Sequence, residues 1–146
     1  DEYHLVTGWP GEAGDVWAVL DSTTATVEAE VECPADAAVP PDEVGELSPN
    51  GRYLDFDYVV FDLEQGTGRC FAETEETKAI QFTTVLDDGT AFGWVDLYGD
   101  DPKVVEVDIT DGSVEESKAE KLPRTEIDGY GIFSDEGTLV VYPRKK

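Results

Sequence analysis

The sequence contains no methionine, one histidine and two cysteines, and only 10 of its 146 residues are lysine or arginine. Because position 1 is Asp rather than Met, we expect a processed chain or a fragment of a longer one, preceded by a leader, a membrane anchor or a further domain. No stretch approaches the roughly 18 to 20 apolar residues of a membrane-spanning helix, and no signal-peptide core is present. We therefore expect no membrane contact by this segment.

Motifs for catalysis and for zinc are also missing. The single histidine, His4, lies near the N-terminus, and the sequence has no G-x-S-x-G, H-E-x-x-H or phosphate-cradling glycine loop. Two cysteines and one distant histidine lack the close-spaced pairs of a zinc site. The sequence thus predicts no catalytic site. Paired carboxylates are the enzymatic alternative, but the 34 acidic residues do not single out a pair.

The charge is strongly one-sided. With 34 acidic and 10 basic residues the formal net charge is −24, so nucleic acid and anionic lipid should be repelled. The acidic residues are spread through the chain, which is typical of a protein that stays soluble in an extracytoplasmic or salty medium. The alternatives are a cation-binding surface, a docking face for a basic partner and a halophilic intracellular protein.

The two cysteines, Cys33 and Cys70, are an even number, which favours a disulfide and a secreted or extracytoplasmic location. Closing a loop of about 38 residues would stabilise the fold by about 3 to 4 kcal/mol on the chain-entropy account. Two separate buried thiols are the alternative.

Short strands with regularly spaced turn signals predict a single all-β domain over 1–146. The clearest alternation is at 26–33, where Val27, Ala29, Val31 and Cys33 share one face. Further strands are predicted over 3–7, 15–20, 52–63, 67–72, 79–86, 90–98, 103–109, 127–133 and 138–142, with an outer strand or a loop over 113–120. We predict a turn at 8–11 and, because of its three prolines, a surface loop over 34–46.

Two sets of landmarks recur along the chain. Acidic or amide residues followed by glycine precede strands at Asn50-Gly51, Asp88-Gly89 and Glu136-Gly137, so the glycines are 38 and 48 residues apart. Aspartates end strands at Asp21, Asp62 and Asp108, which are 41 and 46 residues apart. Both spacings are typical of a four-stranded propeller blade of about 40 to 50 residues.

The residues Ser48-Pro49-Asn50-Gly51-Arg52-Tyr53-Leu54, followed by Val60-Phe61-Asp62-Leu63-Glu64-Gln65-Gly66, resemble blades of the WD-repeat and TolB-like β-propeller proteins. In those families an S-P-D-G turn leads one strand and a D-L-x-x-G turn follows another. The chain departs from the pattern because 52–63 shows no hairpin turn and the Gly-His and Trp-Asp dipeptides are missing. The resemblance implies antiparallel four-stranded repeats but no common active site.

The repeats amount to about three blades, which is fewer than the four to eight blades of closed rings. We therefore expect a fragment of a longer propeller or a homo-oligomer whose chains complete one ring, with a β-sandwich as the alternative fold. Cys33 and Cys70 fall in outer strands of successive blades, which need not be close. Since a disulfide needs Cα atoms within about 7 Å, this pair counts against a regular propeller.

Asp87-Asp88 and Asp100-Asp101 lie in adjacent predicted hairpin turns and are candidate ligands for calcium, the one cofactor that we consider. The alternative is that these aspartates stabilise their own turns, because Asp side chains bond local backbone. The three tryptophans, Trp9, Trp17 and Trp94, are expected in the core.

Together these features predict an acidic, extracytoplasmic binding or scaffolding module with a protein or carbohydrate partner. The alternative is a carboxylate-dependent hydrolase or lyase on a β-propeller scaffold. A pocket with two facing carboxylates about 5 to 10 Å apart and a raised pKa would favour the enzyme. An aromatic or edge-strand surface would favour binding.

Overall fold

The computed structural model describes residues 4–34, 45–96, 100–116, 132–133 and 139–140. Every regular element within these residues is a β-strand, which confirms the all-β prediction for this part of the chain. Among the described residues there is no helix long and apolar enough to cross a membrane.

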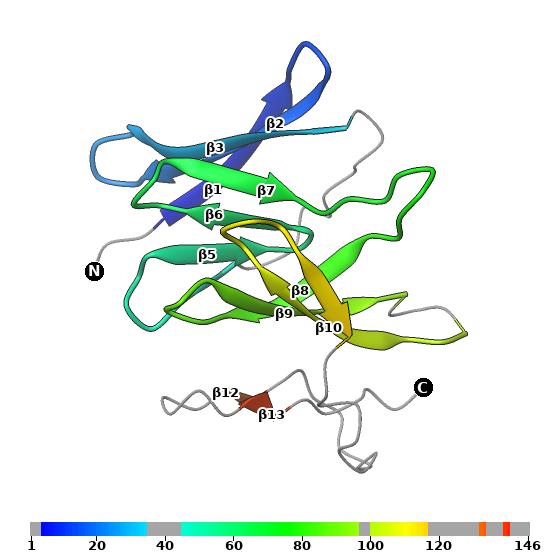
Figure 1. The fold of residues 1–146 in the computed structure, drawn as a ribbon. Coiled ribbons are helices and arrows are strands. Elements are labelled where there is room, and N and C mark those ends of the chain that lie inside the picture. Colours follow the sequence, from blue (N-terminus) through cyan, green and yellow to red (C-terminus); the bar gives the residue numbers. More distant parts are fainter. Residues whose placement is uncertain (1–3, 35–44, 97–99, 117–131, 134–138, 141–146) are drawn as a thin grey trace.

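The first sheet has seven strands in the order β1-β2-β3-β7-β6-β5-β4 (Figure 1). Its strands are β1 (His4–Pro10), β2 (Gly14–Asp21), β3 (Val27–Pro34), β4 (Glu46–Leu47), β5 (Tyr53–Phe56), β6 (Val59–Asp62) and β7 (Thr67–Cys70). Neighbours pair antiparallel except β3 and β7, which are parallel and joined at the single pair Glu30 and Thr67. The predicted disulfide between Cys33 and Cys70 links the same two strands, with Cα atoms 5.7 Å apart.

The second sheet has four strands, β8 (Ile80–Val85), β9 (Thr90–Val95), β10 (Lys103–Asp108) and β11 (Val114–Glu116). They pair antiparallel in chain order, as β4 to β7 also do, so the chain contains two consecutive four-stranded meanders. A short pair, β12 (Ile132–Phe133) and β13 (Leu139–Val140), follows.

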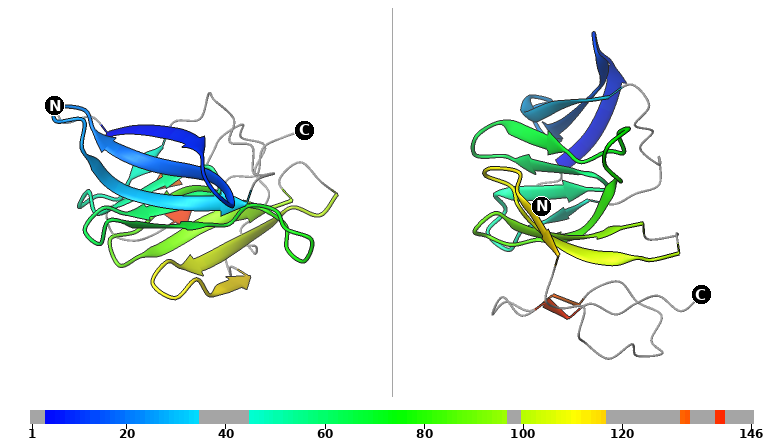
Figure 2. Two further views of the ribbon diagram at one scale, coloured as in Figure 1. Left: turned by 90° about the horizontal axis from the view of Figure 1, so that it is seen from above. Right: turned by 45° about the vertical axis from the view of Figure 1, so that its right-hand side comes forward.

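The hairpin β5–β6 lies at the centre and is buried on both faces. Cross-strand pairing places Leu54 opposite Phe61 and Phe56 opposite Val59, and these four side chains enter the first core. That core also contains Val19, Ala29, Cys33, Tyr58 and Ala72. The first sheet is strongly curled, so its inner face encloses this core between β2–β3 and β5–β6 (Figure 2).

The other face of β5–β6 contacts the second sheet. Tyr53 and Val60 point away from the first core and belong to a second core. Its remaining members are Ile80, Phe82, Val85, Ala91, Val105, Val107 and Ile109. The second sheet therefore covers the outer face of the first sheet at β5–β6, and β4–β7 lie between β1–β3 and β8–β11 (Figures 1 and 2).

The single strand predicted over 52–63 is wrong. The chain reverses at Asp57 and Tyr58, because Phe56 pairs with Val59 and Asp57 has a φ of 51°. Aspartate tolerates this left-handed conformation better than most residues. Since both faces of β5–β6 are buried, apolar residues occupy both and the alternation that would mark two separate strands is absent.

The predicted landmark aspartates occupy three equivalent turns. In each turn the Oδ1 atom of the aspartate accepts a backbone N–H two residues ahead, its carbonyl accepts the N–H four residues ahead, and that fourth residue has a positive φ. The three aspartates and their fourth residues are Asp21 with Ala25, Asp62 with Gly66, and Asp108 with Gly112. The turns follow β2, β6 and β10 and precede β3, β7 and β11. The aspartates that recur in the sequence therefore mark a turn that recurs in the structure.

The glycine landmarks also correspond. Gly51 and Gly89 have φ values of 75° and 86°, and Asn50 and Asp88 each accept the N–H of the residue two positions ahead. The third landmark, Glu136-Gly137, lies outside the described residues.

Other expectations need smaller corrections. The strand expected at 3–7 continues to Pro10, and the turn expected at 8–11 is wrong, because Gly8 pairs with Trp17 of β2. A side chain at position 8 would collide with the Trp17 ring, 2.7 Å from an ideal Cβ, so Gly8 reflects packing rather than a turn. Val27 is exposed, unlike Ala29 and Cys33. Of the loop predicted over 34–46, positions 35–44 lie outside the described residues, while Pro34 ends β3 and Glu46 begins β4.

The burial of β5–β6 on both faces is tested by comparing Val59→Ala with Val60→Ala. Both side chains are fully buried, on opposite faces, so each truncation should lower the free energy of unfolding by about 2 kcal/mol. Val114→Ala, at an exposed position, is the matched control and should cost under about 0.5 kcal/mol. Urea unfolding measures all three, and a near-neutral result for either core variant would contradict the two-core arrangement.

The disulfide should contribute about 3 to 4 kcal/mol, since it closes a loop between residues 37 positions apart and only one other residue pair joins β3 to β7. We expect the double variant Cys33→Ala/Cys70→Ala to unfold at lower urea concentration than the oxidised protein. Adding reductant should lower the urea midpoint of the wild type toward that of the variant and leave the midpoint of the variant unchanged. Equal midpoints for the oxidised wild type and the variant would refute this role.

Candidate functional site

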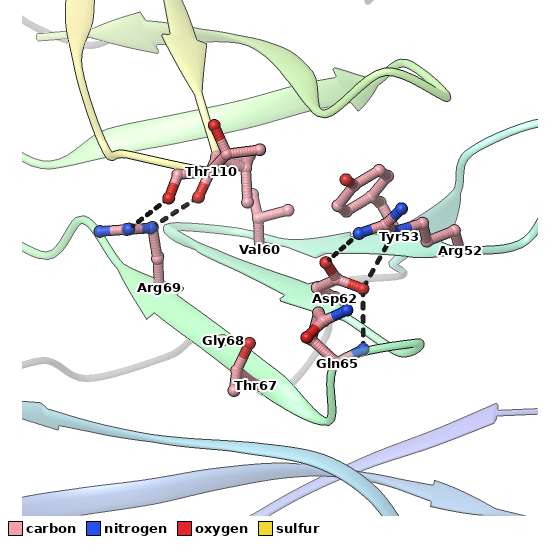
Figure 3. Close-up of a pocket in the computed structure, with 10 residues that line it drawn as sticks. Arg52, Tyr53, Val60, Asp62, Gln65, Thr67, Gly68, Arg69 and Thr110 are labelled. Atoms are coloured by element: carbon pink, nitrogen blue, oxygen red, sulfur yellow. Dashed lines mark hydrogen bonds and ion pairs between the residues drawn. The ribbon is translucent and has the colours of Figure 1, made fainter.

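A pocket of about 220 Å³ lies where the second sheet stops covering the outer face of the first (Figure 3). Strands β5, β6 and β7, with the residue before β5 and the β6–β7 turn, supply most of its lining, and the turn between β10 and β11 supplies the rest. The lining residues are Arg52, Tyr53, Val60, Asp62, Gln65, Thr67, Gly68, Arg69, Ile109 and Thr110. The pocket is thus formed by the contact between the two sheets.

One wall is built on an ion pair between Arg52 and Asp62. The Arg52 Nη2 and Nε atoms donate to the two carboxylate oxygens of Asp62, at 2.8 and 3.2 Å. Its Nη1 atom lies 3.3 Å from Glu64, and its Cζ atom lies 4.9 Å from the centre of the Tyr53 ring. The guanidinium is therefore fixed by two carboxylates and by a cation–π contact.

The opposite wall is built on Arg69, which connects the two sheets. Its Nε atom donates to the carbonyl of Ile109 at 2.6 Å, and its Nη2 atom donates to the carbonyl of Thr110 at 2.8 Å. Gly112 provides room for this side chain, because an ideal Cβ there would lie 2.8 Å from Nη1. Arg69 thus anchors the β10–β11 turn beside β7.

Asp62 is ionised at neutral pH. Burial alone would raise the pKa of this carboxyl, but the hydrogen bonds from Arg52 and from the N–H groups of Gln65 and Glu64 outweigh burial, so the pKa is lowered. The same partners hold the carboxylate in one orientation. Asp62 can accept hydrogen bonds in the pocket, but a carboxyl with a lowered pKa is poorly suited to act as a general acid.

The pocket combines donors and acceptors of both charge signs. Both arginines of the described residues line it, although the whole chain carries a net charge of −24. Gln65 and Thr67 are exposed and add an amide and a hydroxyl, while the buried Val60 adds an apolar surface. The arrangement suits a small ligand that both donates and accepts hydrogen bonds.

The calcium candidates do not come together. Asp87 and Asp88 precede β9, whereas Asp100 and Asp101 follow it, so the two pairs lie at opposite ends of that strand. Asp88 accepts the N–H of Thr90 at 2.9 Å, as expected for an aspartate that stabilises its own turn, whereas Asp87 accepts the N–H of the distant Asn50 at 2.9 Å. Asp101 lies 3.8 Å from the ammonium of Lys103. The described residues contain no group of three or more histidine, cysteine or acidic side chains placed to hold a metal ion. Calcium binding stays a prediction.

The tryptophans differ from one another. Trp17 packs against the first core, with its ring centre 6.2 Å from that of Phe56, and Trp94 is half-buried. Trp9 is exposed on β1, so its expected place in the core is wrong.

The pocket was not predicted, because no sequence motif marks its main residues. Arg52 and Arg69 lie 17 positions apart, within and just after the stretch whose turns resemble propeller blades. The sequence offered one signal for this site, which is that two of only 10 basic residues are arginines within one short segment. The sequence did not reveal that the β10–β11 turn lies beside β7, which is the contact that completes the pocket.

The ion pair of Asp62 predicts a specific acid sensitivity. Because its pKa is lower in the folded protein than the usual value of about 3.9, the ionised group stabilises the fold above that pH. This contribution is lost as the pH falls below about 4 and through the lowered pKa. We expect Asp62→Asn to be less stable than the wild type near neutral pH and the difference to shrink in acid. Urea midpoints across this range measure it, with Glu75→Gln, at an exposed loop position, as control. A difference independent of pH would contradict the ion pair.

Comparisons with protein-family models, with curated proteins and with solved structures found no match.

Proposed function

We propose that the chain is an extracytoplasmic binding module and that the pocket between its two sheets holds a small neutral polar ligand, such as one sugar unit. The observation that carries this proposal is the pocket itself, with Arg69 on one wall and the Arg52–Asp62 pair on the other (Figure 3).

Size and charge favour this class of ligand. A volume of about 220 Å³ is below the roughly 300 to 1,000 Å³ of pockets for drug-sized molecules, so one small unit fits. A net charge of −24 repels anions at long range, and Asp62 and Glu64 already neutralise Arg52. A neutral sugar avoids this repulsion, and its hydroxyl groups both donate and accept hydrogen bonds.

We further propose that the domain is built of propeller-like repeats. Two consecutive four-stranded meanders and three equivalent aspartate turns support this proposal. The contact of β5–β6 with two cores favours stacked repeats over the β-sandwich alternative. The parallel pairing of β3 with β7 is the feature that departs most from separate blades.

The proposed location rests on the disulfide and the charge. Disulfides persist in oxidising compartments and are rare in the cytosol, and a strongly acidic surface suits a protein in an extracytoplasmic medium.

The hydrolase or lyase alternative has no observation in its favour at this pocket. The one carboxylate among the lining residues is Asp62, and its pKa is lowered rather than raised.

Ligand binding is tested by titrating the protein with neutral hexoses, hexuronic acids and amino sugars and following backbone amide signals by NMR. We expect shifts around the pocket with at least one neutral hexose at millimolar concentration. Thr67→Val and Gln65→Ala each remove one exposed polar group, so each should weaken binding about fivefold without loss of stability. Gln81→Ala, outside the pocket lining, is the matched control and should bind as the wild type does. Shifts elsewhere, or none with any neutral sugar, would overturn the proposal.

A further inference from the structure

Among the described residues, no strand covers the outer face of the first sheet at β1–β3, beyond the part that the second sheet covers. Three large apolar side chains are exposed there: Leu5 by 57%, Trp9 by 41% and Val27 by 52%. Single exposed apolar residues are common on protein surfaces, but a group on one sheet face is not.

The strand register places these residues side by side. Leu5 pairs with Leu20, which pairs with Val27, so all three share one face and form an apolar row across β1, β2 and β3. Trp9 lies on the same face of β1, opposite Val16 of β2. Because paired residues point to the same side of a sheet, this face of β1 and β2 is apolar apart from Thr7, which lies between Leu5 and Trp9.

Acidic side chains border this apolar area on β3. Val16 pairs with Glu32 and Ala18 pairs with Glu30, so both glutamates share its face, and both are exposed. Neighbouring strands are about 4.8 Å apart, so the acidic border lies about 10 Å from β1.

We propose that this face, defined by Leu5, Trp9, Val27, Glu30 and Glu32, is a docking surface for a basic amphipathic helix of a partner protein. The apolar stripe of such a helix would cover β1–β2, and the lysine or arginine residues beside the stripe would lie over β3. A helix about 10 Å wide matches the separation between the apolar area and the acidic border.

The negative charge of the chain favours a basic partner over a second copy of the same chain. A second copy carries the same net charge of −24 and would place its own Glu30 and Glu32 in the contact. Like charges at an interface oppose association, whereas a basic partner is attracted at long range and neutralises the two glutamates.

The test uses a labelled synthetic peptide of leucine and lysine, about five helical turns long, with leucines on one side. Fluorescence anisotropy with the full chain should show saturable binding that weakens as salt is added. Glu30→Lys should weaken binding at least fivefold, and so should the double variant Leu5→Ser/Trp9→Ser. A thermal melt checks that the double variant is folded, and Glu30→Lys tests the face independently of it.

Matched controls separate the face from the charge of the whole chain. Glu106→Lys changes the net charge by the same amount at an exposed position of β10, and Leu47→Ser/Val114→Ser removes two exposed apolar residues elsewhere. Both should bind as the wild type does. Equal weakening by Glu30→Lys and Glu106→Lys, equal binding of a leucine–glutamate peptide, or no binding at millimolar peptide would overturn the proposal. A dimer that disappears in Leu5→Ser/Trp9→Ser would instead assign the face to a second copy and also overturn it.

Discussion

The burial of β5–β6 on both faces is the constraint on which the rest of the structure depends. Leu54, Phe56, Val59 and Phe61 supply one side of the first core, and Tyr53 and Val60 supply part of the second. Neither β1–β3 nor β8–β11 could bury its apolar face without this hairpin between them. Its two-residue turn at Asp57 and Tyr58 keeps it short, so that both strands are covered almost completely.

The pocket and the open face follow from the same constraint. The second sheet covers β5–β6, but its β10–β11 turn reaches only as far as β7, where Arg69 holds it. A hollow remains at that border, and β1–β3 continue beyond it with an outer side that no described strand covers. Two candidate binding surfaces therefore arise from one cause, which is the limited width of the second sheet relative to the seven-stranded first sheet.

Local patterns in the sequence predicted local structure well. The landmarks Asp21, Asp62 and Asp108 were found as repeats because an aspartate turn depends on side-chain bonds within a few residues. The break at Asp57 and the exposure of Trp9 were not predictable, because each depends on what covers a strand. The same holds for Arg69, whose role depends on carbonyl groups 40 and 41 positions away.

Two adjacent residues of β7 connect three parts of the molecule. Successive side chains of a strand point to opposite faces, so Arg69 reaches outward to the carbonyls of the β10–β11 turn and Cys70 reaches inward to Cys33 of β3. The disulfide therefore fixes the strand that carries one wall of the pocket. β3 and β7 share only one other paired position, whereas β6 and β7 pair at four positions. Reduction would therefore loosen β3 from β7 and leave the ladder of β5, β6 and β7 beside the pocket in place. The disulfide and the Arg69 contacts therefore attach β1–β3 and the second sheet, respectively, to the same strand of the central meander.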